Sequence, residues 1–302
     1  MKNIWNKLFN KKKYSNDKVL LKLNKEKDKY FSLISPELDK VLKNLKTKKE
    51  ISFIHYGHLG DIINCLPFIK EVSKNKKCNL FIQLKKKIPE KFRLNDTHPF
   101  GEYYLNEKSA KKMIPLLKKQ NFLKRVEFYK KQNIDINLNF FRELPINFNM
   151  DSVRWYFHLA GIHTDLSKPY ILTKGHKKFK KNIVIVRSLR RQNIYINYKF
   201  LKFYKNVLFI GLKDEYLDLK KQIPNLKFHD CKNFLEMAMI IKNCKVFIGN
   251  LTFGYALAEA IKVPRLLESN MNLPLVYPNG VNAYDFYFQK HFENLFKKLY
   301  NI

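Results

Sequence analysis

The stretch ISFIHYGHLGDIINCLPFIKEVSKN, residues 51–75, decides the fold class of this chain. Its first six residues are rich in isoleucine and aromatic side chains, as in a buried strand, and residues 61–75 follow with the pattern of a helix. A second apolar run at 79–83 completes a strand, helix and strand unit. Because a crossover helix joins parallel strands, this unit predicts an α/β fold with a parallel sheet.

A second series of alternating strands and helices begins near residue 182. Strands are expected at 182–186, 207–211, 245–249 and 264–268, and helices at 213–222, 233–243, 254–262 and 285–300. The first half should contain further helices at 30–46, 110–120 and 151–161. The polar stretch 164–182 lacks periodicity and predicts a linker. The expected divisions are a basic lead-in at 1–50, Rossmann-like domains at 51–165 and 180–275, and a C-terminal helix at 281–302.

The composition restricts the classes of protein to which this chain can belong. It has 302 residues and a net charge of +33, yet only eight of its 59 basic residues are arginine. Lysines spread along the whole chain indicate solvated faces rather than a groove-reading patch, so we expect no specific nucleic-acid partner. The four cysteines lack the spacing of a zinc site or a disulfide framework, and no apolar run reaches the ~18 residues of a membrane span. We therefore expect a cytoplasmic protein.

The first residues, MKNIWNKLFNKKK, are basic but lack the apolar core of a signal peptide. Ile4, Trp5, Leu8 and Phe9 could form one face of a short amphipathic helix. Two interpretations stay open. The segment is either a weak peripheral contact with the inner face of the cell membrane or a locally packed N-terminal helix.

The first candidate motif, Gly57-His58-Leu59-Gly60-Asp61, joins the first strand to its helix. Glycines in a turn at the carboxyl end of a parallel strand allow a ligand to approach the backbone, and the helix N-terminus offers free N–H groups. Asp61 has two interpretations, a general base that takes a proton from an acceptor hydroxyl or a helix N-cap.

The second motif, Arg187-Ser188-Leu189-Arg190-Arg191, directly follows the strand at 182–186. Three of the eight arginines fall within these five residues. The guanidinium group has a fixed fork of donors that suits phosphate, so this cluster predicts a diphosphate clamp. A solvated run of charge is the alternative.

The third motif, Gly249-Asn250-Leu251-Thr252-Phe253-Gly254, again joins a strand to a helix start, and Tyr255 continues it. Such a turn can accept an anion through backbone N–H groups and the helix dipole, although ordinary capping by Asn250 or Thr252 gives the same pattern. A matching motif thus lies in each half of the chain.

Other polar residues complete the set of candidates. Glu259 and Glu268 can accept hydrogen bonds from ribose or sugar hydroxyls, with a surface role as the alternative. We include Gly211, at the end of the strand at 207–211, among the donor-binding candidates. The histidines lack metal spacing and no Asp-x-Asp ion site occurs, so neither a metal nor a cofactor is expected.

Taken together, the three motifs resemble those of the heptosyltransferase-like glycosyltransferases of family 9, over residues 51–268. GHLGDIINCLPFIKEV resembles the N-terminal signature of that family, and KVFIGNLTFGYALAEAIKVPRLLE resembles its donor-binding segment. The resemblance implies a GT-B fold, in which two doubly wound domains face a central cleft. It also implies that Asp61 is the catalytic base and that Arg187, Arg190 or Arg191 contacts the donor phosphate. Residues 250–255 lack the acid and histidine usual in the donor loop of the family.

The implied reaction is metal-independent, inverting transfer of a sugar from a nucleotide-diphosphate donor to a hydroxyl of a glycan or glycolipid acceptor. Such an activity serves the building of the cell envelope. The candidate donor-binding residues are Gly57, Gly60, Arg187, Arg190, Arg191, Gly211, Asn250, Thr252, Gly254, Tyr255 and Glu259. Two alternatives remain, namely another nucleotide-sugar enzyme such as an epimerase, and a non-catalytic protein that binds nucleotides or polyanions.

Overall fold

The computed structural model describes residues 7, 9–89, 101–143, 150–270 and 275–302. It divides into two compact units, Met1–Thr47 and Lys48–Ile302. Within the described part, no helix is long and apolar enough to cross a membrane. Ile4, Trp5 and Leu8 lie outside the described residues, and Phe9 is exposed.

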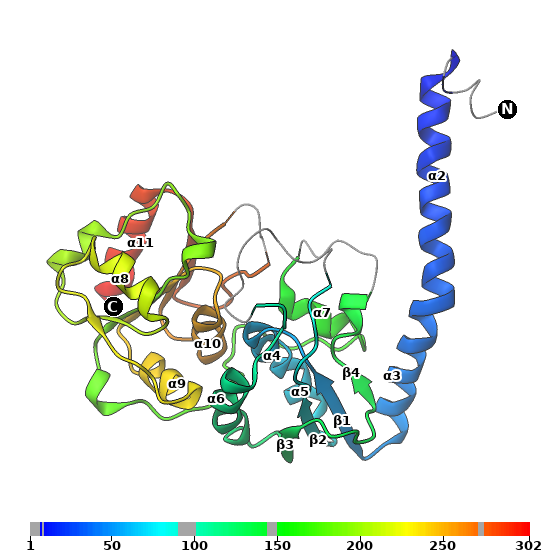
Figure 1. The fold of residues 1–302 in the computed structure, drawn as a ribbon, viewed down its shortest axis with the longest axis horizontal. Coiled ribbons are helices and arrows are strands. Elements are labelled where there is room, and N and C mark those ends of the chain that lie inside the picture. The colour runs from blue at the N-terminus through cyan, green and yellow to red at the C-terminus, as the bar shows by residue number, and fades with distance from the viewer. Residues whose placement is uncertain (1–6, 8, 90–100, 144–149, 271–274) are drawn as a thin grey trace. The chain divides into compact units, whose positions relative to one another are not determined.

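The first unit is a single helical run (Figure 1). It comprises α2 (Lys11–Lys29), a π-helical turn (Tyr30–Ile34) and α3 (Ser35–Thr47). Asn10 caps α2 by accepting a hydrogen bond from the backbone N–H of Lys13 at 3.0 Å. The wider π turn directly precedes Pro36, which has no N–H to donate to the carbonyl four residues earlier. The helix expected at 30–46 is therefore present, whereas the long helix α2 is absent from the sequence-based prediction.

The second unit contains two separate parallel sheets, which confirms the α/β prediction (Figure 1). The first sheet has the order β3-β2-β1-β4. Its strands are β1 (Glu50–His55), β2 (Lys77–Ile82), β3 (Arg125–Phe128) and β4 (Ile136–Asn137). Ile51 of β1 pairs in register with Cys78 of β2, and both are buried. The predicted strand, helix and strand unit thus forms the centre of this sheet.

The second sheet has the order β10-β9-β8-β5-β6-β7. Its strands are β5 (Ile183–Val186), β6 (Val207–Phe209), β7 (Lys227–Phe228), β8 (Val246–Gly249), β9 (Arg265–Glu268) and β10 (Ala283–Phe286). The expectation of a helix from residue 285 is wrong in its first part, because β10 pairs with β9 before the C-terminal helix begins. Phe286 of β10 stacks on Phe292 of that helix, with ring centroids 4.1 Å apart.

Helices cover the sheets. They are α4 (Leu59–Asn64), α5 (Leu66–Val72), α6 (Glu107–Lys118), α7 (Ser152–His158), α8 (Lys213–Lys220), α9 (Phe234–Lys242), α10 (Phe253–Ile261) and α11 (Gln289–Tyr300). The single helix expected at 61–75 is two helices, because Pro67 cannot donate to the carbonyl of Ile63. Asp151 caps α7 through a hydrogen bond from the backbone N–H of Val153, at the start of the helix expected at 151–161.

The two sheets are joined through their helices. α10 packs against α4, and α6 packs against α9, as Figure 1 also shows. The stretch expected to be a linker packs here as well, because the backbone N–H groups of Tyr170 and Ile171 both donate to the carbonyl of Ala260 in α10. The contact between α4 and α10 places the helices that follow the first and third motifs side by side.

Candidate active site

Asp61 lies in the first turn of α4, directly after β1 and its glycine turn. The N-cap of this helix is His58, so Asp61 does not cap it and that interpretation is wrong. The Asp61 carboxylate instead accepts a hydrogen bond from the guanidinium of Arg142. Both side chains are largely buried, with 23% of the aspartate and 15% of the arginine exposed.

This ion pair sets the charge of Asp61. Burial is the largest single effect and would raise the pKa of the carboxyl group, but the charge of Arg142, its hydrogen bond and the nearby histidines together hold the pKa below its usual value. Asp61 is therefore ionised at neutral pH. Arg142 in turn packs over the rings of Tyr104 and Phe141, each 5.0 Å from its guanidinium carbon.

Gly57 makes room for this pair. A Cβ atom at residue 57 would lie 2.6 Å from a guanidinium nitrogen of Arg142 and 2.8 Å from the ring of His55. Any larger residue would displace one of them. Gly60 differs, because a Cβ atom there would have no described atom within 4 Å.

Buried hydrogen bonds with His55 and Tyr156 fix the position of the glycine turn between β1 and α4. The backbone N–H of Gly57 donates to Nδ1 of His55 at 2.9 Å, and the hydroxyl of Tyr156 donates to the carbonyl of Asp61 at 3.1 Å. Nε2 of His55 lies 3.0 Å from that hydroxyl and therefore carries the proton. Burial lowers the pKa of His55 to about 3, so the ring stays neutral.

His58 connects the two halves of the unit electrostatically. Burial, with smaller contributions from the charges of Arg142 and Arg190, lowers the pKa of His58 to about 4 against the opposing effect of Asp61. Arg190 follows β5 in the second sheet, whereas His58 and Asp61 follow β1 in the first. A partly exposed arginine from the second motif thus lies close enough to the first motif for their charges to interact.

Arg187, the first arginine of the second motif, has a different environment. Its Nε and one terminal nitrogen donate to the two carboxylate oxygens of Glu268, at 2.7 and 2.9 Å, and the pair is fully buried. Glu268 also accepts hydrogen bonds from the backbone N–H of Asn193 and the hydroxyl of Tyr198. The expectation that Glu268 accepts from a sugar hydroxyl and Arg187 donates to phosphate is therefore corrected, because each satisfies the other inside the protein. Arg190 and Arg191 remain partly exposed.

The third motif joins the loop after β8 to the loop after β5. The side chain of Asn250 accepts from the backbone N–H of Ser188 at 2.9 Å and donates to its carbonyl at 2.8 Å. Thr252 caps α10 by accepting from the backbone N–H of Tyr255. Thr252 thus has the capping role that the sequence left open, whereas buried Asn250 does not cap α10 and instead binds the backbone of Ser188.

Close packing explains Gly254. A Cβ atom there would lie 2.7 Å from the side chain of Val186, so glycine lets α10 approach the end of β5. Tyr255 is buried beside Phe247 and is a core residue rather than a surface ligand-binding one. Gly211 lies exposed in the turn between β6 and α8.

Glu259 is also internal. It accepts hydrogen bonds from Lys262 and from Nε of Arg265, whose side chain is completely buried. Because its carboxylate is paired with two buried cations, Glu259 stabilises the end of α10 and is not placed to accept a hydrogen bond from a sugar hydroxyl.

Arg142 is the main residue of this site that sequence reasoning missed. It follows no strand of an expected βα unit, and 81 residues separate it from Asp61. A signal was nevertheless present, because arginine is scarce in this lysine-rich chain. The argument that singled out residues 187–191 applies equally to Arg142.

Comparison with known proteins places the fold. No protein-family model and no curated protein matches this sequence. The crystal structure of the glycosyl transferase family 9 from Veillonella parvula DSM 2008 superposes on it with a TM-score of 0.52 at 13% identity, covering 84% of this chain and 90% of that chain. This chain has the fold of a family 9 glycosyltransferase.

Two heptosyltransferase structures from E. coli are similar at lower scores. WaaC with ADP-2-deoxy-2-fluoro heptose has a TM-score of 0.46 at 10% identity, covering 82% of this chain and 99% of that chain. ADP-heptose lps heptosyltransferase II has a TM-score of 0.47 at 10% identity, covering 83% and 98%. The assignment of the family 9 fold rests on the Veillonella protein.

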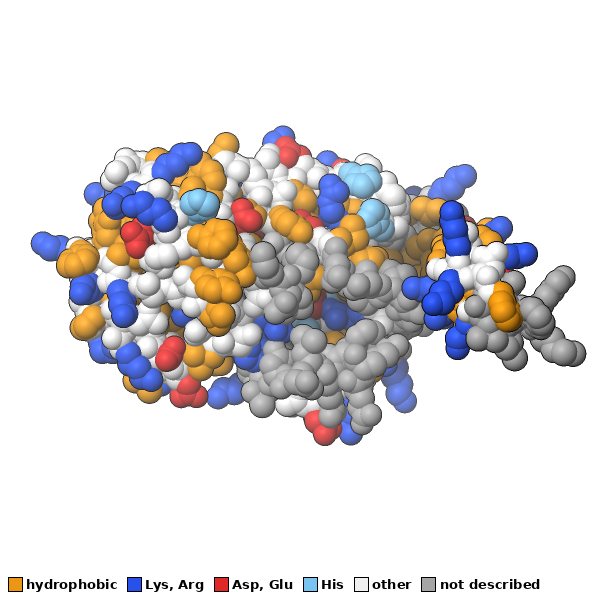
Figure 2. Space-filling view, turned by 90° about the horizontal axis from the view of Figure 1, so that it is seen from above, with side chains coloured by type: hydrophobic (Ala, Val, Ile, Leu, Met, Phe, Trp, Pro, Cys, Tyr) orange, Lys and Arg blue, Asp and Glu red, His pale blue; other side chains and the backbone are white. Residues whose placement is uncertain are grey.

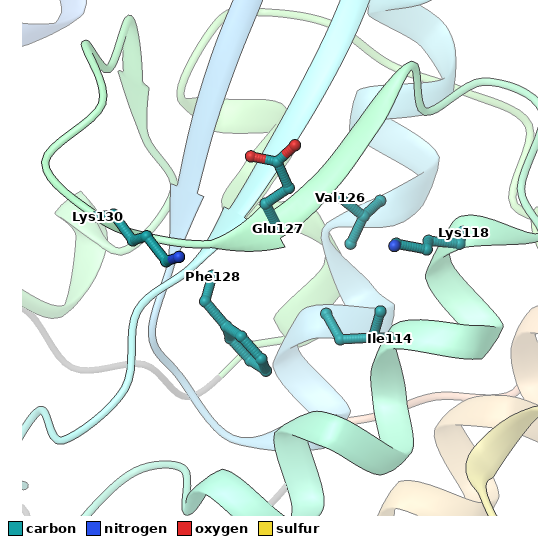
Figure 3. A pocket seen from close by; sticks show the side chains of 6 residues that line it. All are labelled: Ile114, Lys118, Val126, Glu127, Phe128 and Lys130. Carbon is teal, nitrogen blue, oxygen red and sulfur yellow. The ribbon is translucent and has the colours of Figure 1, made fainter.

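The family 9 fold of this chain also carries a surface depression of about 280 Å³ on the edge of the first sheet (Figure 3). It is lined from α6 and the edge strand β3, by Ile114, Lys118, Val126, Glu127, Phe128 and Lys130. None of these residues belongs to a candidate motif. Among the described residues, no group of three His, Cys, Asp or Glu side chains is placed to hold a metal ion.

Proposed function

We propose that this protein is a glycosyltransferase that moves a sugar from a nucleotide-diphosphate donor to a hydroxyl group of an acceptor. One observation carries the proposal. Asp61 forms an ion pair with Arg142, and His58, in the same strand-to-helix turn as Asp61, lies within electrostatic reach of Arg190, which follows a strand of the second sheet. A base and a cation suited to phosphate are thus available at one place, as such a transfer requires.

In the proposed reaction Asp61 is the general base. It accepts the proton of the acceptor hydroxyl while the hydroxyl oxygen bonds to the anomeric carbon of the donor sugar. The bond from that carbon to the diphosphate oxygen breaks, and the nucleotide diphosphate leaves with the electron pair. A single displacement of this kind inverts the anomeric configuration. Because the pKa of Asp61 is low, proton transfer is favourable only as the hydroxyl becomes acidic in the transition state.

Arg190 and Arg191 are the proposed partners of the leaving diphosphate. Both are partly exposed, whereas Arg187 is buried in its pair with Glu268. The N-terminus of α10, which begins at Phe253, adds the positive end of a helix dipole on the same half. In this proposal protein groups alone carry the developing negative charge. Gly60, whose Cβ position has no described atom within 4 Å, lets the donor or acceptor approach the backbone of the first motif, whereas the space at Gly57 is filled by Arg142 and His55. Gly211 lies in a further strand-end turn of the donor half.

The proposed acceptor is a hydroxyl of a glycan or glycolipid of the cell envelope. The enzyme would then work in the cytoplasm, with a peripheral contact to the inner face of the membrane through its basic N-terminal helical unit. On the face of the second unit seen in Figure 2, Lys and Arg side chains are spread without gathering in one patch, which supports a small anionic donor over a nucleic acid.

A thermal-shift screen with nucleoside diphosphates and nucleotide sugars tests the donor. A ligand at 100 times its Kd should stabilise the fold by about 2.7 kcal/mol. Incubation of the best ligand, labelled in its sugar, with envelope glycans should then give a labelled acceptor. Free epimerised sugar would instead indicate an epimerase, and stabilisation by every polyanion alike would indicate non-specific binding.

A further inference from the structure

Helix α2 presents a stripe of lysines to solvent. Lys18, Lys22, Lys25 and Lys29 are spaced by four, three and four residues, and all four are exposed. Since an α-helix has 3.6 residues per turn, this spacing places them on one face. None of the 19 residues of α2 is buried.

A group of exposed apolar side chains lies on another side of the same helix. Val19, Leu20 and Leu23 are 54%, 57% and 57% exposed. At about 100° per residue these three side chains point away from the lysine stripe. Lys27 lies between Leu20 and Leu23 on the same side, and Leu21, also exposed, lies beside the stripe. The apolar series continues beyond the helix end with Tyr30 and Phe31, which are also exposed. Large apolar side chains gathered on an unburied helix face indicate a surface that another body covers.

The charge of the unit selects the kind of body. Residues 1–47 contain 13 lysines and five acidic residues, a net charge of +8. Two copies of the unit packed through their apolar sides would bring two such charges together, which opposes self-association. A nucleic acid would satisfy the lysines but would leave the leucines in water. An anionic lipid bilayer satisfies both, with lysines at the headgroups and apolar side chains at the acyl boundary.

We propose that α2 is a membrane-surface helix that lies in the plane of an anionic bilayer, with Val19, Leu20 and Leu23 inserted and the lysine stripe at the phospholipid headgroups. The inference deepens the peripheral contact of the proposed function, and it rests on that function only for its biological setting. In this proposal the membrane contact is made by α2 and not by the first ten residues.

Co-sedimentation of the full-length protein with vesicles tests this surface. Vesicles of phosphatidylcholine alone are compared with vesicles that also contain phosphatidylglycerol. One variant replaces Lys18, Lys22, Lys25 and Lys29 by Gln, and another replaces Val19, Leu20 and Leu23 by Gln. Glutamine is a good helix former, and no residue of α2 is buried, so both variants should fold. The matched control replaces four exposed lysines of the second unit by Gln, namely Lys119, Lys130, Lys227 and Lys297.

The unmodified protein should bind the anionic vesicles, and more salt should weaken binding. Each lysine near the surface contributes roughly a fivefold factor, so loss of four lysines in the stripe variant should weaken binding roughly 600-fold. The apolar variant should also lose binding, and the control should retain most of it. Equal losses in the stripe variant and the control would overturn the proposal, because overall charge would then explain binding. Absence of binding, or a change only in oligomeric state by sedimentation velocity, would overturn it too. No donor is used, so this failure would leave glycosyl transfer untouched.

Discussion

The guanidinium of Arg142 donates a hydrogen bond to the carboxylate of Asp61 across 81 residues of sequence. A Cβ atom at residue 57 would lie 2.6 Å from a guanidinium nitrogen of Arg142, so a larger residue there would have to displace the arginine. The same contact that keeps Asp61 ionised thus also restricts the sequence of the turn before it.

Replacing Asp61 by Asn should reduce sugar transfer by roughly 10²–10⁴-fold, because the amide cannot accept the proton of the acceptor. The variant keeps the shape of the side chain but leaves Arg142 without its counter-charge, so its melting temperature should also fall. Transfer is therefore compared at a temperature where both proteins are folded by circular dichroism. Asp230→Asn, at an exposed aspartate of the second half, should transfer normally. Normal transfer by folded Asp61→Asn would remove the proposed base.

Replacing Arg142 by Gln should raise the pKa of Asp61, because burial would then act without the opposing guanidinium. The acidic limb of the pH profile of transfer should move to higher pH. The same shift has a stability counterpart. In the unmodified protein the low pKa of Asp61 stabilises the fold above the unfolded-state pKa of about 4, and this contribution is lost as the pH falls through the lower folded-state value. An unmoved acidic limb would mean that another group controls it.

Replacing Arg190 or Arg191 by Ala should weaken the binding of a nucleoside diphosphate by about 1.5–3 kcal/mol, the range for a hydrogen bond to a charged group. Isothermal titration calorimetry measures this loss directly. Lys199→Ala, an exposed cation beyond the same loop, serves as the control for overall charge. Unchanged affinity in both arginine variants would reduce the cluster to a solvated run of charge.

Replacing Glu268 by Gln should destabilise the second sheet strongly. The carboxylate is completely buried and neutralises Arg187, so its loss leaves a buried cation and should lower the unfolding free energy by about 3–5 kcal/mol. Urea denaturation checks this. Tyr198→Phe removes one neutral donor to the same carboxylate and should cost about 1 kcal/mol. Glu127→Gln on the exposed edge strand should leave stability unchanged. Wild-type stability in Glu268→Gln, with donor binding lost, would return Glu268 to the ligand.

Replacing Gly254 by Ala should destabilise the fold by about 1–3 kcal/mol, because the new methyl group would overlap the side chain of Val186. Val186→Ala in the same chain should recover part of the loss, and the difference between the single and double variants measures the overlap. Gly60→Ala is the matched control, since no described atom lies within 4 Å of its Cβ position. An equal loss in both glycine variants would point to the backbone rather than to packing.

The pattern of apolar side chains predicted most of the second unit. Alternating buried strands and amphipathic helices are local features, so the strand at 51–56 and the helix at 151–161 could be recognised from the residues themselves. The same local pattern predicted that Asp61 and the arginine cluster at 187–191 follow the carboxyl ends of parallel strands. It failed for β10, whose pairing with β9 overrides the expected helix start.

What joins these local pieces depends on the tertiary structure. Asp61 and Arg142 meet because β4 pairs beside β1 at the edge of the first sheet and Arg142 lies five residues beyond β4. Glu268 pairs with Arg187 because only β8 separates β9, which ends at Glu268, from β5, which Arg187 directly follows, so both side chains lie at the same edge of the parallel sheet. Sequence alone therefore determined which strands and turns form and which side chains stand at their ends. Only the order of the strands in each sheet decided which of those side chains neutralise one another and which stay accessible, because charges interact through space and not along the chain.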